Sequence, residues 1–263
     1  MPSPRVALLQ SSGRPGDVAH NLAALDEAAG RSADAGARVL LASELFLSGY
    51  ALGDALPGLA EPAEGPGAEA VAKIASSRGL SVGYGYPERA GGRTYNSVQL
   101  VTPDGHRANY RKTHLYGAYE TAHFTPGDTL VVRARPPGTD LTVGLLICYD
   151  VEFPEAVRAH ALAGTDLLLV PTALMRPYES VAHTVVPTRA WESQLYIGYA
   201  NRCGTEGDTV FAGLSCLAAP DGTVRARAGT GEDLLIADVD PESLAASRRR
   251  NPYLADRRPE LYG

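Results

Sequence analysis

Two stretches of this chain, which begin at Asp34 and at Leu162, share one pattern. In each, an expected helix ends at a glycine, Gly36 or Gly164, and a strongly apolar run follows within a few residues. Glycine ends helices because it adopts the left-handed backbone conformation without strain. A strand that is apolar throughout needs cover on both of its faces. The pattern therefore predicts an α/β fold in which two sheets face each other and helices cover their outer sides.

Hydrophobic periodicity and turn residues predict alternating strands and helices along the whole chain. Helices are expected over 21–35, 68–77, 154–163 and 181–193. Strands are expected over 5–10, 39–43, 80–86, 95–101, 107–112, 141–147, 166–170, 195–201, 213–218, 223–228 and 234–239, with a Gly- and Pro-rich loop over 53–67. Because no linker divides the pattern, we expect a single domain over residues 1–246 and an irregular, Arg-rich tail over residues 247–263.

The composition argues against several classes of function. The 263 residues carry a net charge of −6, whereas a protein that binds nucleic acid usually presents a basic face. The first residues show no charged leader before a long apolar run, and no stretch is apolar for long enough to span a membrane. Three cysteines without a C-x-x-C spacing are typical of a reducing compartment, so we expect a cytoplasmic protein.

Cys148 lies where an apolar strand is expected to turn into a helix near Pro154. Such an elbow exposes one side chain at the edge of a sheet, and the backbone N–H groups that follow point toward a bound ligand. A thiol in this position is expected to have a lowered pKa and to act as a nucleophile. The alternative is a buried structural cysteine. Cys203 and Cys216 lack this context, and we expect both to be structural.

Glu44 and Lys112 each end an expected strand. A carboxylate in so apolar a segment is costly without a task or a partner, and burial would raise its pKa toward the range of a general base. Lys112 is one of only two lysines among 24 basic residues, which indicates a position that needs a compact ammonium. Glu120 follows closely enough to hold that ammonium. A capping or salt-bridged role for Glu44 and a solvated surface role for Lys112 are the alternatives.

Other catalytic patterns are absent from the sequence. The six histidines form neither H-x-x-x-H nor H-E-x-x-H, which argues against a zinc site. No G-x-S-x-G and no P-loop occurs, and no dinucleotide-binding glycine motif follows an expected strand. We therefore expect neither a metal nor an organic cofactor.

Together these segments resemble the nitrilase superfamily of carbon–nitrogen hydrolases, whose Glu–Lys–Cys triad occurs in this chain order. The matching runs are Ser43-Glu44-Leu45-Phe46, Tyr110-Arg111-Lys112-Thr113-His114-Leu115 and Leu146-Ile147-Cys148-Tyr149-Asp150. Glu120 matches a second, positioning glutamate. Residues 84–89, 95–100, 171–173 and 251–254 are similar to the amidase branch that includes 5-aminopentanamidases. The resemblance covers nearly the whole chain and implies a four-layer α-β-β-α sandwich that forms homodimers or higher homo-oligomers.

The resemblance also implies a mechanism. Glu44 takes the thiol proton of Cys148, and the thiolate attacks the amide carbon. Lys112, which Glu120 orients, and the backbone N–H of Tyr149 stabilise the oxyanion, and water then hydrolyses the thioester. The further candidates for substrate binding are Tyr50, Tyr116 and Glu152.

The expected substrate is a small aliphatic carboxamide. Family members that act on substrates with a free carboxylate tend to have an arginine where Glu152 stands. A carboxylate there favours an ω-amino, guanidino or neutral tail, unless backbone groups hold it. The alternatives are a nitrilase or an N-carbamoyl or ureido hydrolase with the same triad, an acyltransferase, and a catalytically silent binding or scaffold protein.

Overall fold

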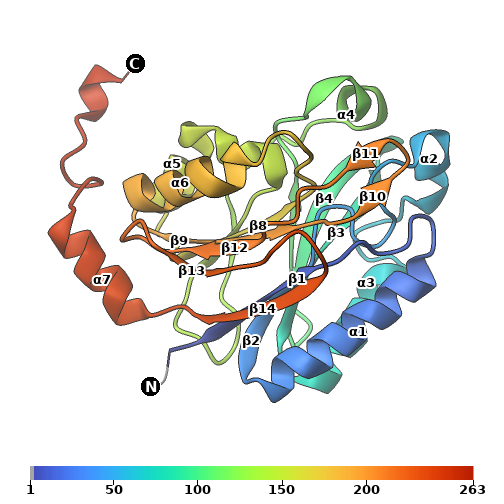
Figure 1. Cartoon of the computed structure of the whole chain (residues 1–263), viewed down its shortest axis with the longest axis horizontal. Helices are drawn as coiled ribbons and strands as arrows, with labels where there is room; N and C mark the ends of the chain where they lie inside the picture. The colour runs from blue at the N-terminus through green and yellow to red at the C-terminus, as the bar shows by residue number, and fades with distance from the viewer. Residues whose placement is uncertain (1–2, 263) are drawn as a thin grey trace.

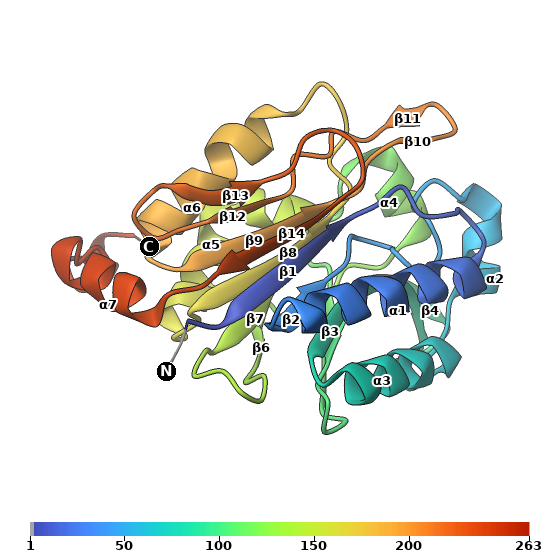
Figure 2. The same ribbon diagram turned by 60° about the horizontal axis from the view of Figure 1, so that its bottom comes forward.

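The computed structural model describes residues 3–262, and its elements form four layers (Figure 1). Helices α1 (Val18–Asp34) and α3 (Pro66–Arg78) cover the outer face of one sheet. Helices α5 (Pro154–Leu162) and α6 (Val186–Ser193) cover the outer face of the other, as Figure 2 also shows. The expected α-β-β-α sandwich is confirmed.

Each sheet has six strands and a parallel centre. The first sheet has the order β14-β1-β2-β3-β4-β5 and the second β13-β12-β9-β8-β7-β6. Neighbours among β1, β2 and β3, and among β7, β8 and β9, pair in parallel. The strands are β1 (Arg5–Gln10), β2 (Ala37–Leu41), β3 (Ser81–Ala90), β4 (Arg93–Val101), β5 (Arg107–Arg111), β6 (Val132–Ala134), β7 (Val143–Leu145), β8 (Leu167–Thr172), β9 (Tyr196–Asn201), β12 (Cys216–Ala218), β13 (Val224–Arg227) and β14 (Asp233–Asp238).

The two glycines of the repeated pattern have the expected conformation. Gly36 has a φ of 78° and precedes β2, and Gly164 has a φ of 84° and precedes β8. Both strands lie at the parallel centre of their sheets. The repeated pattern thus marks the same strand–helix–strand unit in each half of the sandwich, and that prediction is confirmed.

Strand β1 shows why its sheet is apolar on both faces. Val6 and Leu8 point into the core between the two sheets, whereas Ala7 and Leu9 point into the core beneath α1 and α3. This alternation is the two-residue period of a strand. The same inter-sheet core receives side chains of the second sheet, such as Leu169.

Several short elements were not predicted. Helix α2 (Leu56–Leu59) lies within the expected loop, and β6, α4 (Gly117–His123) and the hairpin of β10 (Thr205–Glu206) and β11 (Thr209–Val210) lie outside the expected elements. The helix expected over 181–193 begins with a wider π-helical turn before α6. These pieces are too short to show a hydrophobic period.

Helix α7 (Pro241–Arg250) corrects the expectation that the chain is irregular from residue 247. The Asp240 side chain caps its first turn by accepting a hydrogen bond from the N–H of Glu242 at 2.9 Å. Ser247 is buried and donates to Gln194 Oε1 at 2.8 Å. Leu244 is its one apolar side chain buried in the core, and the helix ends in three arginines, so apolar periodicity does not reveal it.

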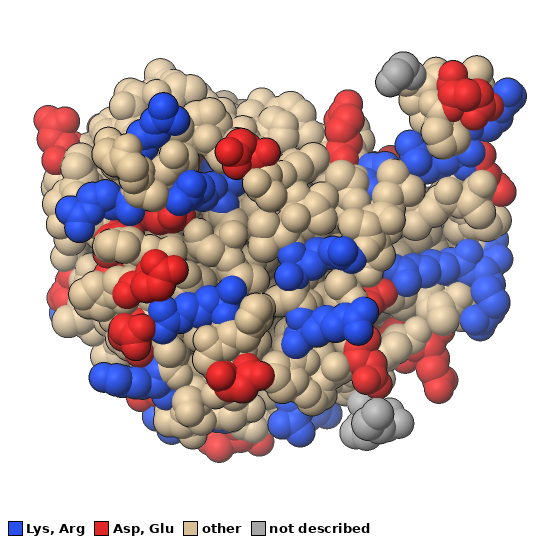
Figure 3. Space-filling view, turned by 180° about the vertical axis from the view of Figure 1, so that it is seen from behind, with Lys and Arg blue, Asp and Glu red and all other residues tan. Residues whose placement is uncertain are grey.

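None of the helices within residues 3–262 has the length and apolar character that crossing a membrane requires. On the face shown in Figure 3, basic and acidic side chains are interspersed.

Candidate active site

Cys148 lies on the expected elbow between strand and helix. Strand β7 ends at Leu145, Cys148 begins a 3-10 turn over Cys148–Glu152, and α5 follows. The φ of Cys148 is 43°, in the left-handed region that residues other than glycine rarely adopt. Its side chain lines a cavity of about 260 Å³. The turn thus presents the thiol to a space that a small molecule can enter.

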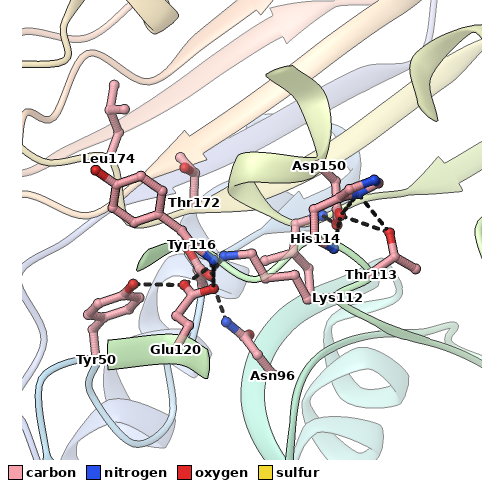
Figure 4. A network of polar contacts seen from close by, with 12 residues as sticks. Tyr50, Asn96, Lys112, Thr113, His114, Tyr116, Glu120, Asp150, Thr172 and Leu174 are labelled. Carbon is pink, nitrogen blue, oxygen red and sulfur yellow. Dashed lines mark hydrogen bonds and ion pairs between the residues drawn. The ribbon is translucent and has the colours of Figure 1, made fainter. Parts of the chain in front are cut away.

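Lys112 lies directly after β5 and is fully buried. Its Nζ is 2.7 Å from Glu44 Oε1 and 2.7 Å from Glu120 Oε1, and Figure 4 shows it directed at Glu120. Burial opposes its charge, but the carboxylates of Glu44 and Glu120 outweigh burial and raise the pKa of Lys112. The ammonium therefore stays charged at neutral pH.

Glu44 is also buried, and burial raises its pKa above the usual value, with the Glu120 carboxylate adding to this and Lys112 opposing it. Its Oε1 accepts hydrogen bonds from Lys112 and, at 2.7 Å, from Asn96 Nδ2. Its Oε2 has no hydrogen-bond partner within residues 3–262. One oxygen of the carboxylate is thus fixed, and the other is free to accept a proton.

The expectation of a lowered pKa for the Cys148 thiol is wrong. Burial and the Glu44 carboxylate raise its pKa well above the usual value, while Lys112 and a hydrogen bond from Thr172 only partly oppose this. A short 3-10 turn does not compensate for burial beside a carboxylate. The thiol is therefore neutral at rest and needs a base before it can attack.

The expected binding residues surround this centre. Tyr50 OH donates to Glu120 Oε1 at 2.7 Å, and the backbone N–H of Tyr116 donates to Glu120 Oε2 at 2.7 Å. The ring centroids of Tyr116 and Tyr149 are 5.2 Å apart. The cavity is lined by Tyr50, Tyr116, Cys148, Tyr149, Glu152, Ala173, Leu174, Met175, Tyr178 and Val181.

Glu152 is the one acidic residue among those that line this mostly apolar cavity. The neighbouring Arg189 directs Nη1 to Glu192 Oε1 at 2.9 Å and Nη2 to the backbone carbonyl of Glu152 at 2.7 Å. Its guanidinium is thus hydrogen-bonded to groups other than the Glu152 side chain. Burial raises the pKa of the Glu152 carboxyl, and Lys112 and Arg189 oppose this.

Asp150 is a residue whose role the sequence did not reveal. Its Oδ1 accepts from Thr113 Oγ1 and from the N–H of His114, each at 2.9 Å (Figure 4). Its Oδ2 accepts from Tyr110 OH at 2.8 Å and from the N–H of Ile147 at 3.0 Å. Asp150 thereby links the residues on both sides of Lys112 to Ile147, which precedes Cys148. A carboxylate two positions after Cys148 was the available signal.

Asn96, on β4, was also missed. Its side chain holds Glu44, and its backbone carbonyl accepts the N–H of Lys112 at 2.8 Å. One residue of the sheet thus fixes both the carboxylate and the ammonium. Within residues 3–262, no three His, Cys, Asp or Glu side chains are grouped as a metal site would require.

The family model for carbon–nitrogen hydrolases matches residues 5–249, so the chain belongs to that family. It is a hydrolase that acts on non-peptide carbon–nitrogen bonds in amides. The chain is 48% identical to a Pseudomonas protegens protein described as the hydrolase in the pqqF 5' region, over 98% of this chain and 90% of that one. It is 39% identical to an (R)-stereoselective amidase of a Pseudomonas species, over 98% and 93%.

Solved structures of an amidase from a Nesterenkonia species are similar as well. A double mutant in complex with acrylamide superposes with a TM-score of 0.89 at 36% identity and covers 99% of this chain and 96% of that one. In another mutant of that enzyme, with a TM-score of 0.86, 36% identity and the same coverage, the acetamide moiety of fluoroacetamide is covalently added at the active-site cysteine.

Proposed function

We propose that this hydrolase is an amidase that converts small aliphatic carboxamides into carboxylic acids and ammonia through a thioester on Cys148. The observation that carries the proposal is the buried ammonium of Lys112, 2.7 Å from both Glu44 and Glu120, beside the cavity that the thiol lines. The covalent adduct at the cysteine of the Nesterenkonia amidase supports a nucleophilic role for the corresponding thiol.

The first step forms a tetrahedral intermediate. The free Oε2 of Glu44 takes the thiol proton, and the sulfur of Cys148 forms a bond to the amide carbon. The carbonyl oxygen becomes an anion, which Lys112 and the backbone N–H of Tyr149 stabilise. That N–H donates to no other backbone group of residues 3–262 and is available for the oxyanion.

The second half of the reaction releases both products. Protonated Glu44 gives its proton to the leaving nitrogen, the carbon–nitrogen bond breaks, and ammonia departs from the thioester. Glu44 then takes a proton from water, whose oxygen attacks the thioester carbon. The carbon–sulfur bond breaks, the acid is released, and the proton returns to Cys148.

The cavity favours a short substrate with a cationic or neutral tail. A volume of about 260 Å³ holds a molecule of a few carbon atoms beyond the amide. Glu152 faces this space, and the rings of Tyr116 and Tyr178, whose centroids are 6.3 Å apart, add faces that attract a cation. A carboxylate tail would meet the Glu152 carboxylate, so a dicarboxylic monoamide is disfavoured.

A substrate panel with an ammonia readout tests the tail. We expect release from 5-aminopentanamide, 4-guanidinobutanamide and butyramide to exceed release from a dicarboxylic monoamide of equal length. A preference for the monoamide would overturn the assignment of Glu152. If an added amine accepts the acyl group faster than water does, the enzyme is an acyltransferase.

Mass spectrometry of acid-quenched enzyme tests the thioester. The expected adduct has the mass of the substrate less ammonia and lies on the peptide that contains Cys148. Cys148→Ser is expected to lose turnover, whereas Cys216→Ser, at a buried cysteine outside the cavity, keeps it. Full turnover by Cys148→Ser, or an adduct on another residue, would contradict the mechanism.

A further inference from the structure

Arg202, just after β9, is one of the largest fully buried side chains of the protein, and the reaction described above does not use it. It forms an ion pair with Glu206 of β10, which is also buried. Burial lowers the pKa of Arg202, and Glu206 partly restores it. Removing two charges from water costs free energy, so a buried ion pair needs further hydrogen bonds, which apolar side chains do not supply.

The ion pair contacts both ends of the segment that carries Glu44 and Tyr50. Arg202 Nη1 lies 3.5 Å from the backbone carbonyl oxygen of Glu44. Glu206 Oε2 accepts the N–H of Tyr50 at 2.8 Å and the N–H of Ala51 at 2.9 Å. Arg202, after β9 of the second sheet, and the β10–β11 hairpin therefore hold the backbone that carries Glu44 and Tyr50.

That segment has an irregular backbone. Leu45, next to the base, has a φ of 48°, in the left-handed region. It packs so closely on β3 that a Cβ added to Gly85 would lie 2.3 Å from the N of Leu45. Backbone groups outside strands need other partners when they are buried. The hairpin supplies them, and Phe211 after it packs against the Tyr50 ring with centroids 6.0 Å apart.

We propose that Arg202 and Glu206 are positioning residues, which set the place of the Glu44 carboxylate and of the Tyr50 hydroxyl through the backbone between them. The inference rests on the proposed function. A carboxylate at position 206 accepts two amides at once, and a guanidinium at 202 spans the Glu44 carbonyl and, at 2.8 Å, the carbonyl of Ser12. Without the pair, the base moves relative to the thiol.

The test variant carries Arg202→Met and Glu206→Gln, which removes both charges and keeps an oxygen at 206. We expect kcat to fall by about 10- to 100-fold, since misplacement of a catalytic group by about 1 Å has effects of that order. KM is expected to change much less. Glu206→Gln alone is measured as well, so that a folded variant is available if the double variant fails to fold.

The matched control is Arg248→Met with Asp166→Asn. This pair, 3.0 Å apart, also combines an arginine that donates to backbone carbonyls with a carboxylate that accepts a backbone N–H, but it joins α7 to the start of β8. We expect the control to lose thermal stability and to keep kcat. An Arg202/Glu206 variant that folds and keeps kcat, or a control that loses kcat equally, would overturn the proposal.

Alkylation by iodoacetamide separates this inference from the proposed function. Its rate at Cys148, followed by peptide mass, depends on proton removal by Glu44 and needs no amide turnover. We expect slower alkylation in the Arg202/Glu206 variants than in the wild type and the control. If the wild type cleaves no amide, the proposed function fails, while unchanged alkylation in folded variants refutes the positioning role by itself.

Discussion

The raised pKa of the Cys148 thiol and the raised pKa of the Glu44 carboxyl act together. A half-buried thiol beside a carboxylate is a poor nucleophile until it loses its proton. A carboxyl with a raised pKa is a better base once it is ionised. Lys112 compensates the negative charge that forms when the proton moves. At the scale of single residues, the proposed mechanism therefore depends on the ionised fraction of Glu44.

Asn96→Ala tests this dependence. The hydrogen bond from Asn96 stabilises the ionised form of Glu44, so its loss raises the carboxyl pKa further. A hydrogen bond to a charged group contributes about 1.5 kcal/mol or more, which corresponds to about one pH unit. We therefore expect the acid limb of the profile of kcat/KM against pH to shift to higher pH by about one unit.

Ser97→Ala is the control for this shift. The adjacent Ser97 side chain is buried as well but donates to Glu88 Oε2 at 2.7 Å instead of to Glu44. The acid limb of the pH profile of Ser97→Ala is expected to coincide with that of the wild type. An Asn96→Ala profile that coincides with that of Ser97→Ala would refute the pKa argument.

At the scale of elements, the 3-10 turn over Cys148–Glu152 depends on a contact with β5. Asp150 caps this turn through the N–H of Ile147 and holds the residues around Lys112. It is fully buried, so all of its acceptor capacity is directed at protein donors. The relative position of the Cys148 thiol and the Lys112 ammonium is thus set by one side chain of the turn.

Asp150→Asn replaces one acceptor oxygen of this clamp with a donor. Leaving a buried donor unpaired costs about 1–3 kcal/mol, so we expect a lower free energy of unfolding by that amount in urea titrations. We also expect a lower kcat. Glu155→Gln, at an exposed position in the first turn of α5, is the matched control. Equal stability of the two variants would count against the clamp.

Helix α7 belongs to the folded body up to its last turn. Arg248 donates to the carbonyls of Gln194 and Thr165 as well as pairing with Asp166. Contacts after the helix are fewer: Leu254 packs against the core and Tyr253 OH accepts from Trp191 Nε1 at 3.1 Å, but the side chains of Tyr253 and Tyr262 are exposed. Tolerance to truncation follows the burial and hydrogen bonding of the part removed.

Two truncated chains test this boundary. A chain that ends at Arg250 is expected to unfold near the wild-type temperature. A chain that ends at Asp240 loses α7 and is expected to unfold at a clearly lower temperature. Differential scanning fluorimetry of both measures the effect, and equal losses in the two chains would contradict it.

At the scale of the whole molecule, the site lies where the two halves of the sandwich meet. Glu44, Lys112 and Asn96 come from the first sheet and the segments that follow its strands, whereas Cys148 comes from the elbow after β7 of the second. The outer helical face of the second sheet exposes Leu162 and Trp191, with fractional exposures of 52% and 38%. Both side chains are accessible for contact with another subunit.

We expect the protein to form a homodimer through the face of α5 and α6. Light scattering after gel filtration should give the mass of two chains. Leu162→Asp, at the end of α5, should shift the mass toward one chain, whereas Val210→Asp, at an exposed position of the β10–β11 hairpin, should not. A wild-type mass of one chain, or a dimer unaffected by Leu162→Asp, would rule out this interface.

The sequence by itself determined the arrangement of the sheets and predicted the residues of the candidate site. Apolar runs that follow Gly36 and Gly164 predicted the central strands, because local patterning dictates which segments need cover on two faces. Glu44, Lys112 and Cys148 were identified because each is an unusual residue type at the end of an apolar strand. Such signals are local, so they can be recognised in a single sequence.

Only the tertiary structure decided how these groups are tuned and held. The direction of the Cys148 pKa shift depends on burial and on Glu44, which belongs to another part of the chain. The roles of Asn96, Asp150 and the Arg202–Glu206 pair come from hydrogen bonds between segments distant in sequence. A local pattern contains no record of such contacts, because they exist only once the two sheets have packed together.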